Sequence, residues 1–122
     1  MFAYAIVTPI AMSMGIAHAL VLRCDPRTIM VCSPIGCERG NSRVYLLIDT
    51  DKKTYSRCDS KGCDTYEGIV LNTSGQFGSI QIPGRSILQK MDLETGRYTE
   101  VATLMLDVYV NHGQCKTTEE SP

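Results

Sequence analysis

Six cysteines are the residues best able to do chemistry in this sequence, and four of them lie in a repeated motif. Positions 28–38 and 54–64 align without a gap as T-x-x-x-C-[SD]-x-x-G-C-[ED]. In each copy, four residues separate the two cysteines. That spacing suits either a disulfide across a tight turn or half of a Cys₄ zinc site. The chemistry of the protein therefore depends first on whether these sulfurs are oxidised.

The residues between the paired cysteines favour the disulfide. Ser33 and Asp59 suit the first position of a type I turn. Gly36 and Gly62 suit its last position, where a left-handed residue makes a bulge. Such a turn places its two cysteines on opposite strands, within the distance that a disulfide spans. The two remaining cysteines lie near the ends of the domain and meet if its first and last strands are neighbours. The predicted pairs are Cys32–Cys37, Cys58–Cys63 and Cys24–Cys115.

The first 19 residues point to an oxidising compartment. They contain no Asp, Glu, Lys or Arg and end in Ala17-His18-Ala19, the small-x-small pattern that signal peptidase cuts. We expect a cleaved signal peptide over 1–19, a mature chain beginning at Leu20 and no membrane anchor after cleavage. A transmembrane anchor and a core segment of the mature domain are the alternatives. An oxidising compartment does not keep thiolates free, which favours disulfides over the zinc site.

The length and the charge of the chain exclude several classes of protein. Its 122 residues correspond to one domain, and Lys+Arg 12 against Asp+Glu 13 gives a net charge of −1. This balance does not fit a nucleic-acid-binding protein, which usually carries a basic stripe. The sequence has no C-x-x-C, no EF-hand calcium loop and no phosphate-binding glycine loop before a helix. We expect no cofactor.

The other reactive side chains point to structural roles. His112 is the only histidine after the predicted signal, and its position between Asn111 and Gly113 predicts an exposed turn residue. Three acidic pairs fall at predicted turns, where carboxylates cap backbone amides or stay solvated. We predict no catalytic and no metal-binding residue, and an enzyme with a carboxylate site is the last alternative. The acidic pairs are Asp49/Asp51, Asp59/Asp64 and Asp92/Glu94.

The segments that must position these residues have the pattern of short strands between turns. Turn signals recur about every 8–12 residues, which is typical of an all-β, mostly antiparallel meander forming a small barrel or sandwich. We expect this β domain over 20–116 and a polar tail over 117–122. The expected strands are 43–48, 54–58, 65–71, 77–82, 86–91, 97–103 and 105–110, with 86–91 also compatible with a helical turn.

Five tyrosines fall on these segments. They could form a binding face together, but strand tyrosines are more often half-buried with a hydrogen-bonded hydroxyl, and we expect that arrangement. They are Tyr45, Tyr55, Tyr66, Tyr98 and Tyr109.

Several segments resemble motifs of a family of small, uncharacterised exported bacterial proteins with paired C-x₄-C hairpins. They are 54–66, Ser74-Gly-Gln-Phe77, Glu100-Val-Ala-Thr103 and Gly113-Gln-Cys115. The resemblance implies a periplasmic or secreted location and brings no activity with it. Cys24, Cys115 and Ser74-Gly75 also resemble, more weakly, periplasmic lysozyme inhibitors of the small-barrel type. The two tight cysteine hairpins depart from that pattern.

These observations favour a non-enzymatic, exported binding or inhibitor module of the cell envelope. We expect a monomer with an unidentified protein or envelope partner. A Cys₄ zinc-binding protein and the carboxylate enzyme are the alternatives. Intact mass separates the first two, because each disulfide removes two protons whereas zinc adds a metal that acid releases.

Overall fold

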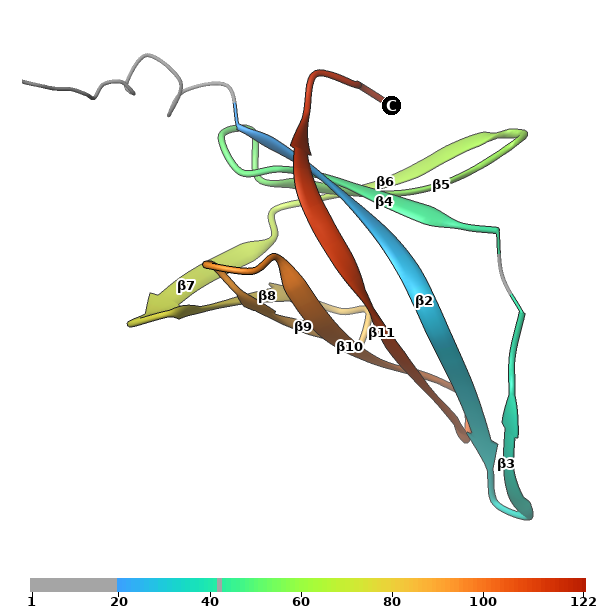
Figure 1. The fold of residues 1–122 in the computed structure, drawn as a ribbon. Coiled ribbons are helices and arrows are strands. Elements are labelled where there is room, and N and C mark those ends of the chain that lie inside the picture. Colours follow the sequence, from blue (N-terminus) through green and yellow to red (C-terminus); the bar gives the residue numbers. More distant parts are fainter. Residues whose placement is uncertain (1–19, 42) are drawn as a thin grey trace, which may run out of the picture.

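The computed structural model describes residues 20–41 and 43–122, and the regular structure of these residues is entirely β-strand (Figure 1). The predicted signal peptide over 1–19 lies outside the described residues. The strands are β2 (Val21–Ser33), β3 (Gly36–Arg39), β4 (Tyr45–Asp49), β5 (Thr54–Asp59), β6 (Gly62–Glu67), β7 (Val70–Ser74), β8 (Phe77–Ile82), β9 (Ile87–Asp92), β10 (Arg97–Leu104) and β11 (Asp107–Thr118).

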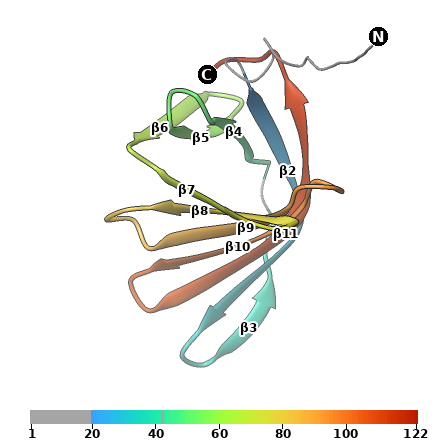
Figure 2. The same ribbon diagram turned by 90° about the vertical axis from the view of Figure 1, so that its left-hand side faces the viewer.

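All of these strands belong to one antiparallel sheet, so the all-β fold predicted from the sequence is confirmed. The order is β6-β5-β4-β2-β11-β10-β9-β8-β7, with β3 paired to the far end of β2. The sheet curls into a C-shaped half-barrel, in which β4–β6 form one arm and β7–β10 the other (Figure 2). A single curled sheet fits the barrel expectation rather than the sandwich, since a sandwich needs two stacked sheets.

The long strands β2 and β11 form the spine that joins the two arms. They pair from Val21/Thr118 to Cys32/Val108, so the first and last strands of the described domain are neighbours, as the predicted disulfide map requires. Cys24 and Cys115 are directly opposed in this register and are bonded to each other. The register shifts between His112 and Gly113, where β2 carries one extra residue.

The two cysteine hairpins have the predicted turn chemistry. Cys32 is bonded to Cys37 and Cys58 to Cys63, each across directly opposed positions. Ser33 Oγ accepts from the Ile35 amide, and a carboxylate oxygen of Asp59 accepts from the Lys61 amide. The two hairpin glycines, Gly36 and Gly62, have φ of 152° and 139°, more extended than the left-handed bulge that was predicted. Only glycine adopts such angles readily.

The apolar core lies on the concave face of the half-barrel. Alternation along each strand sends every second side chain to this face. Ile69 enters the core between β6 and β7, where Gly68 has φ 70° and the Ile69 amide donates to the Lys53 carbonyl. This break divides the single strand that was expected over 65–71. The buried residues of the core are Cys24, Leu46, Ile48, Tyr55, Ile69, Ile80, Ile82, Met91, Tyr98 and Cys115.

The last strand is longer than predicted. The turn falls at Met105 and Leu106, inside the expected strand 105–110, and Met105 has a φ of 57°. From Asp107 the strand then runs through the Asn-His-Gly segment that was interpreted as a turn, and it ends at Thr118, two residues into the predicted tail. The ambiguous segment 86–91 is strand β9, because its neighbours β8 and β10 pair with it along both edges.

Candidate functional site

A hollow of about 590 Å³ lies on the convex face of the sheet, across β8, β9, β10, β11 and β2. This volume is within the range of ligand-binding clefts, about 300–1,000 Å³. Side chains along each strand alternate between the two faces of the sheet. Gln89, Glu100 and Asn111 point to the concave face, so the residues next to them in the sequence point to the convex face. The lining consists of Arg27, Thr28, Phe77, Lys90, Asp92, Arg97, Tyr98, Thr99, His112, Gly113 and Gln114. We call this hollow the outer groove.

Three cations surround the outer groove without an acidic partner. Within the part of the chain that the structure describes, Arg27, Lys90 and Arg97 form no ion pair; the pairs found there both involve Arg23. Lys90 contacts an aromatic ring instead, with Nζ 5.0 Å from the centroid of Phe77. The carboxylate of Asp92 is engaged in the β9–β10 turn, where it accepts from the amides of Glu94 and Thr95 and from Gln76.

A β-bulge places the first of these cations. His112 pairs with Thr28 and Gly113 pairs with Pro26, so Arg27 is the extra residue on β2. A bulge re-aims the side chain of the inserted residue and increases the local twist. Gly113 opposes the bulge because any larger residue would collide there: an added Cβ would lie 2.3 Å from the Asp25 carbonyl oxygen.

His112 also lies in the outer groove, and the turn setting predicted for it is wrong. It occupies the middle of β11, opposite Thr99 on β10 and Thr28 on β2. Its side chain is exposed, and Nδ1 lies 3.1 Å from the Thr99 hydroxyl oxygen. The prediction failed because Asn-His-Gly is a turn signal only when no longer-range pairing competes, and here two strands flank the segment.

A second hollow continues the outer groove towards the edge of the sheet. It has a volume of about 380 Å³ and shares Phe77 and Lys90 with the groove. Ser74, one of the residues that carry the resemblance to lysozyme inhibitors, lines it together with Leu88. Leu88 pairs with Val101, which pairs with Val110, and all three project from the convex face. The convex surface thus combines unpaired cations with an adjoining apolar row.

The concave face of the same strands carries a buried polar row. Gln89, Glu100 and Asn111 oppose one another on β9, β10 and β11, and each is at most 7% exposed. Glu100 accepts a hydrogen bond from the Tyr55 hydroxyl at 2.5 Å and one from Asn111 Nδ2 at 3.3 Å. The bond from Tyr55 links β5 in one arm to β10 in the other.

The polar row is only partly satisfied by protein groups. Among the residues that the structure describes, no hydrogen-bond partner is found for the two side-chain polar atoms of Gln89, the Tyr98 hydroxyl or Asn111 Oδ1. Burial raises the pKa of the Glu100 carboxyl, an effect opposed by the Tyr55 hydrogen bond, the charge of Arg57 and the Asn111 hydrogen bond. Burial and the Glu100 charge raise the pKa of the Tyr55 hydroxyl. Tyr55 thus has the expected hydrogen-bonded hydroxyl but is fully rather than half buried. For Tyr98 the expectation is wrong in both respects.

The six cysteines belong to the framework and not to the groove. All are in disulfides, so the four thiolates that the zinc alternative needs are not present. Three of the acidic residues behave as predicted: the carboxylates of Asp49, Asp59 and Asp92 accept hydrogen bonds from backbone amides two or three residues further along the chain. The turn position predicted for Asp64 is wrong, because this residue lies within strand β6.

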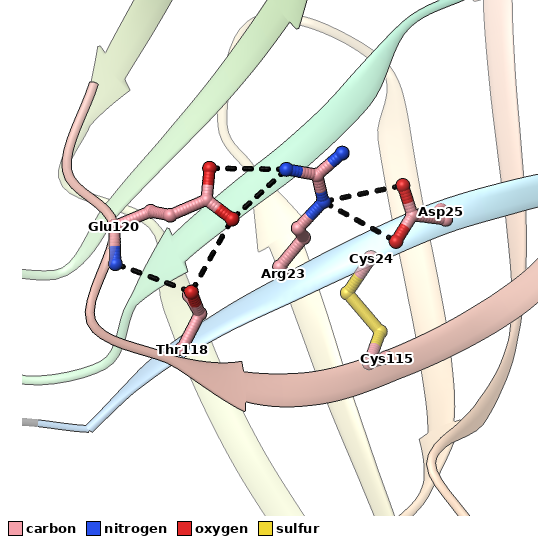
Figure 3. Close-up of polar contacts among 6 residues, drawn as sticks. All are labelled: Arg23, Cys24, Asp25, Cys115, Thr118 and Glu120. Carbon is pink, nitrogen blue, oxygen red and sulfur yellow. Dashed lines mark hydrogen bonds and ion pairs between the residues drawn. A yellow bond between two sulfur atoms is a disulfide. The ribbon is translucent and has the colours of Figure 1, made fainter.

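The polar end of the chain is tied to β2 beside the longest-range disulfide (Figure 3). Arg23 Nη1 donates to both carboxylate oxygens of Glu120, at 2.9 and 3.0 Å, while Arg23 Nε approaches Asp25. The guanidinium also lies 3.9 Å from the centroid of the Tyr45 ring. The hydrogen bond to Glu120 raises the pKa of Arg23 and lowers that of Glu120. This contact holds Glu120, a residue of the predicted polar tail, against the sheet.

The polar row was not predicted from the sequence, because most of the acidic pairs that stand out there lie at turns. The signal was nonetheless present in the expected strand 97–103. Once Tyr98 is assigned to the core face, a period of two places Glu100 on that face as well. A charge at a core-facing position of a strand indicates a partner across the interior, which here is Tyr55.

Comparison with protein-family models, with curated proteins and with solved structures finds no match to this chain. In the described ranges, no helix has the length and apolar character needed to cross a membrane.

Proposed function

We propose that this protein is a non-enzymatic, exported binding module of the cell envelope whose outer groove captures an acidic segment of a partner protein. The observation that carries the proposal is the set of three unpaired cations around one groove. Asp92, the only carboxylate in the lining, is already engaged by turn amides. A surface of one charge sign steers a partner of the opposite sign and raises its association rate.

The magnitudes indicate how such a segment would be held. Each exposed ion pair contributes about 0.2–1 kcal/mol, so three pairs alone give weak and salt-sensitive binding. The apolar row of Leu88, Val101 and Val110 beside the groove supplies further contact area, and apolar burial contributes about 25 cal/mol per Å². We therefore propose a partner segment that combines acidic residues with neighbouring apolar ones.

The disulfides support the exported part of the proposal. Three disulfides in a chain of this size persist in an oxidising environment, as in the periplasm or outside the cell. A periplasmic or secreted location agrees with the resemblance of 54–66 to exported bacterial proteins. An inhibitor is one form of this function, in which the captured acidic segment belongs to the active site of an enzyme.

Fluorescence anisotropy with two labelled peptides tests the groove. One peptide alternates glutamate with leucine over ten residues, and the other replaces each glutamate by glutamine. We expect the first to bind more tightly at low salt, and Lys90→Gln with Arg97→Gln to weaken it by about 3- to 30-fold. Lys52→Gln with Lys61→Gln makes the same charge change away from the groove and should leave the affinity within about twofold. Equal binding of both peptides would exclude the proposed charge recognition.

A lysozyme turnover assay then distinguishes the inhibitor form. Inhibition that Lys90→Gln with Arg97→Gln abolishes would assign the groove to an enzyme's acidic active site. Peptide binding without inhibition would indicate a binding module that acts on another class of partner.

A further inference from the structure

A separate hollow opens on the concave side of the half-barrel, between β2, β4, β5 and β11. It has a volume of about 160 Å³, close to the ~150 Å³ of engineered cavities that take up benzene. Ile29, Val31, Leu46 and Tyr109 are among its apolar walls, and Arg57 and Asn111 bring polar groups to it. It shares no residue with the outer groove. Small-ligand sites combine apolar walls with a few converging polar groups, and they occur in the mouths of β-barrels.

Arg57 supplies an unpaired, partly buried cation. Within residues 20–41 and 43–122 its side chain forms no ion pair and no hydrogen bond. Asp64 lies opposite Arg57 in the β5–β6 register but does not bond to it. The charge of Arg57 acts on Glu100 without a direct contact. A guanidinium beside apolar walls is more stable with an anion, and its planar fork binds a carboxylate through two parallel hydrogen bonds.

Asn111 supplies the second, independent observation. Its side chain is more than nine-tenths buried and lines the same hollow. Nδ2 donates to Glu100, while Oδ1 has no hydrogen-bond partner in the described ranges 20–41 and 43–122. Buried polar atoms in native proteins are nearly always hydrogen-bonded, so an acceptor of this kind beside a hollow indicates a missing donor.

We propose that this hollow binds a small carboxylic acid with an apolar body about the size of one benzene ring. The carboxylate lies on the Arg57 guanidinium, and the apolar body packs against Ile29, Val31 and Leu46. A hydroxyl group on the body donates to Asn111 Oδ1. The site is independent of the outer groove, so the protein would carry a small ligand inside the sheet and a macromolecular partner outside it.

Benzoate, 3-hydroxybenzoate and the neutral analogue benzamide test the proposal when each is titrated into the protein and followed by NMR. We expect benzoate to bind with a dissociation constant of about 1 mM or tighter, given the ligand efficiencies of molecules this small. The Arg57 Nε–H and Asn111 side-chain amide signals should shift, while those of Asn72 and Gln114 stay in place. Benzamide should bind at least about tenfold more weakly, since it lacks the charge.

Two variants locate the site. Arg57→Met should weaken benzoate binding about tenfold or more, whereas the matched Arg85→Met, on the exposed β8–β9 turn, should not. If Arg57→Met does not fold, Val31→Phe narrows the hollow, keeps the cation and should also abolish binding. Both variants should keep glutamate-peptide binding in the outer groove, so failure of this site and failure of the proposed function are distinguishable.

Three results would overturn the proposal. They are equal binding of benzoate and benzamide, unchanged benzoate binding by folded Arg57→Met, or no shift of the Arg57 and Asn111 signals at about 20 mM benzoate. If 3-hydroxybenzoate binds no more tightly than benzoate, the contact assigned to Asn111 Oδ1 is wrong. One neutral hydrogen bond should improve the affinity by up to about tenfold.

Discussion

The two faces of β9, β10 and β11 differ sharply although the same three strands build both. The convex face presents Lys90, Thr99 and His112 to solvent, where charge is easily hydrated and changes are tolerated. The concave face holds Gln89, Glu100 and Asn111 at most 7% exposed, where any polar atom left without a partner costs free energy. The contrast teaches that a charge is tolerated on one face and constrains stability on the other, because desolvation is costly only on the buried side.

The disulfides offer the largest test of this contrast. Cys24–Cys115 lies in the core and closes a loop with a sequence separation of 91, whereas Cys32–Cys37 closes one of 5 at a more exposed hairpin. By the chain-entropy argument the long loop contributes about 4–5 kcal/mol and the short one about 2 kcal/mol. Replacing both Cys24 and Cys115 by Ser should therefore lower the free energy of unfolding more than replacing Cys32 and Cys37. Urea titration of the two variants measures this, and a reversed order would contradict it.

Neighbouring residues of β11 make the next comparison. Gly113→Ala should destabilise by about 2–3 kcal/mol, because the new Cβ meets the Asp25 carbonyl oxygen at 2.3 Å and the Tyr98 ring at 2.6 Å. The exposed His112→Ala should change the free energy of unfolding by less than about 0.5 kcal/mol. Thermal unfolding of both variants decides the point. A Gly113→Ala protein as stable as His112→Ala would mean that the bulge is not tightly packed.

Removing one hydroxyl tests the link across the half-barrel. Of the two described side chains that donate to the Glu100 carboxylate, Tyr55→Phe leaves Asn111 alone, and the loss of the charge-assisted bond should cost about 1.5–3 kcal/mol. Tyr66→Phe alters a partly buried tyrosine on the adjacent strand and serves as the control. Chemical denaturation that showed equal losses in the two variants would remove the special role of the Tyr55–Glu100 bond.

The smallest expected effect is on the pH dependence of stability, to which Glu100 and Glu120 contribute with opposite sign. Burial raises the pKa of Glu100, so its contribution to stability is complete below the ordinary pKa near 4.5 and is lost as pH rises through the higher folded value. The Arg23 hydrogen bond lowers the pKa of Glu120, whose contribution is present above that ordinary value and is lost as pH falls. The free energy of unfolding, measured from pH 3 to 7, should depend less on pH in both variants than in the unaltered protein. In Glu100→Gln the change should appear above the ordinary carboxyl pKa, and in Glu120→Gln below it. Identical profiles for both variants would contradict this assignment.

Local chemistry made much of the framework predictable. Two hairpins were predictable from the turn-forming residues Ser33, Gly36, Asp59 and Gly62. The two cysteines outside these hairpins then remained for the third disulfide. The strand 77–82 was placed correctly because Pro83-Gly84 ends it. In each case the determining interaction lies within about six residues of sequence.

The outer groove was less predictable because its residues are brought together only by strand pairing. Arg27, Lys90 and Arg97 come from three separate strands, and Arg27 reaches the outer groove through a bulge that no local signal announces. The interpretation of Asn111-His112-Gly113 as a turn failed for the same reason, since β2 and β10 hold that segment extended. Glu100 could have been found from alternation, but its partner Tyr55 is 45 residues away.

The position of Cys24–Cys115 has a mechanical consequence. Val21 and Thr118 lie at the same end of the β2–β11 pair, because the two strands are antiparallel. Pulling these two residues apart would therefore separate the strands one residue pair at a time. Only Val21/Thr118, Leu22/Thr117 and Arg23/Lys116 precede the bonded pair Cys24/Cys115. Beyond them a tensile load passes directly through the covalent S–S bond from one strand to the other. The pairs of β2 and β11 beyond this bond would therefore remain unloaded while tension acts on the two strand ends.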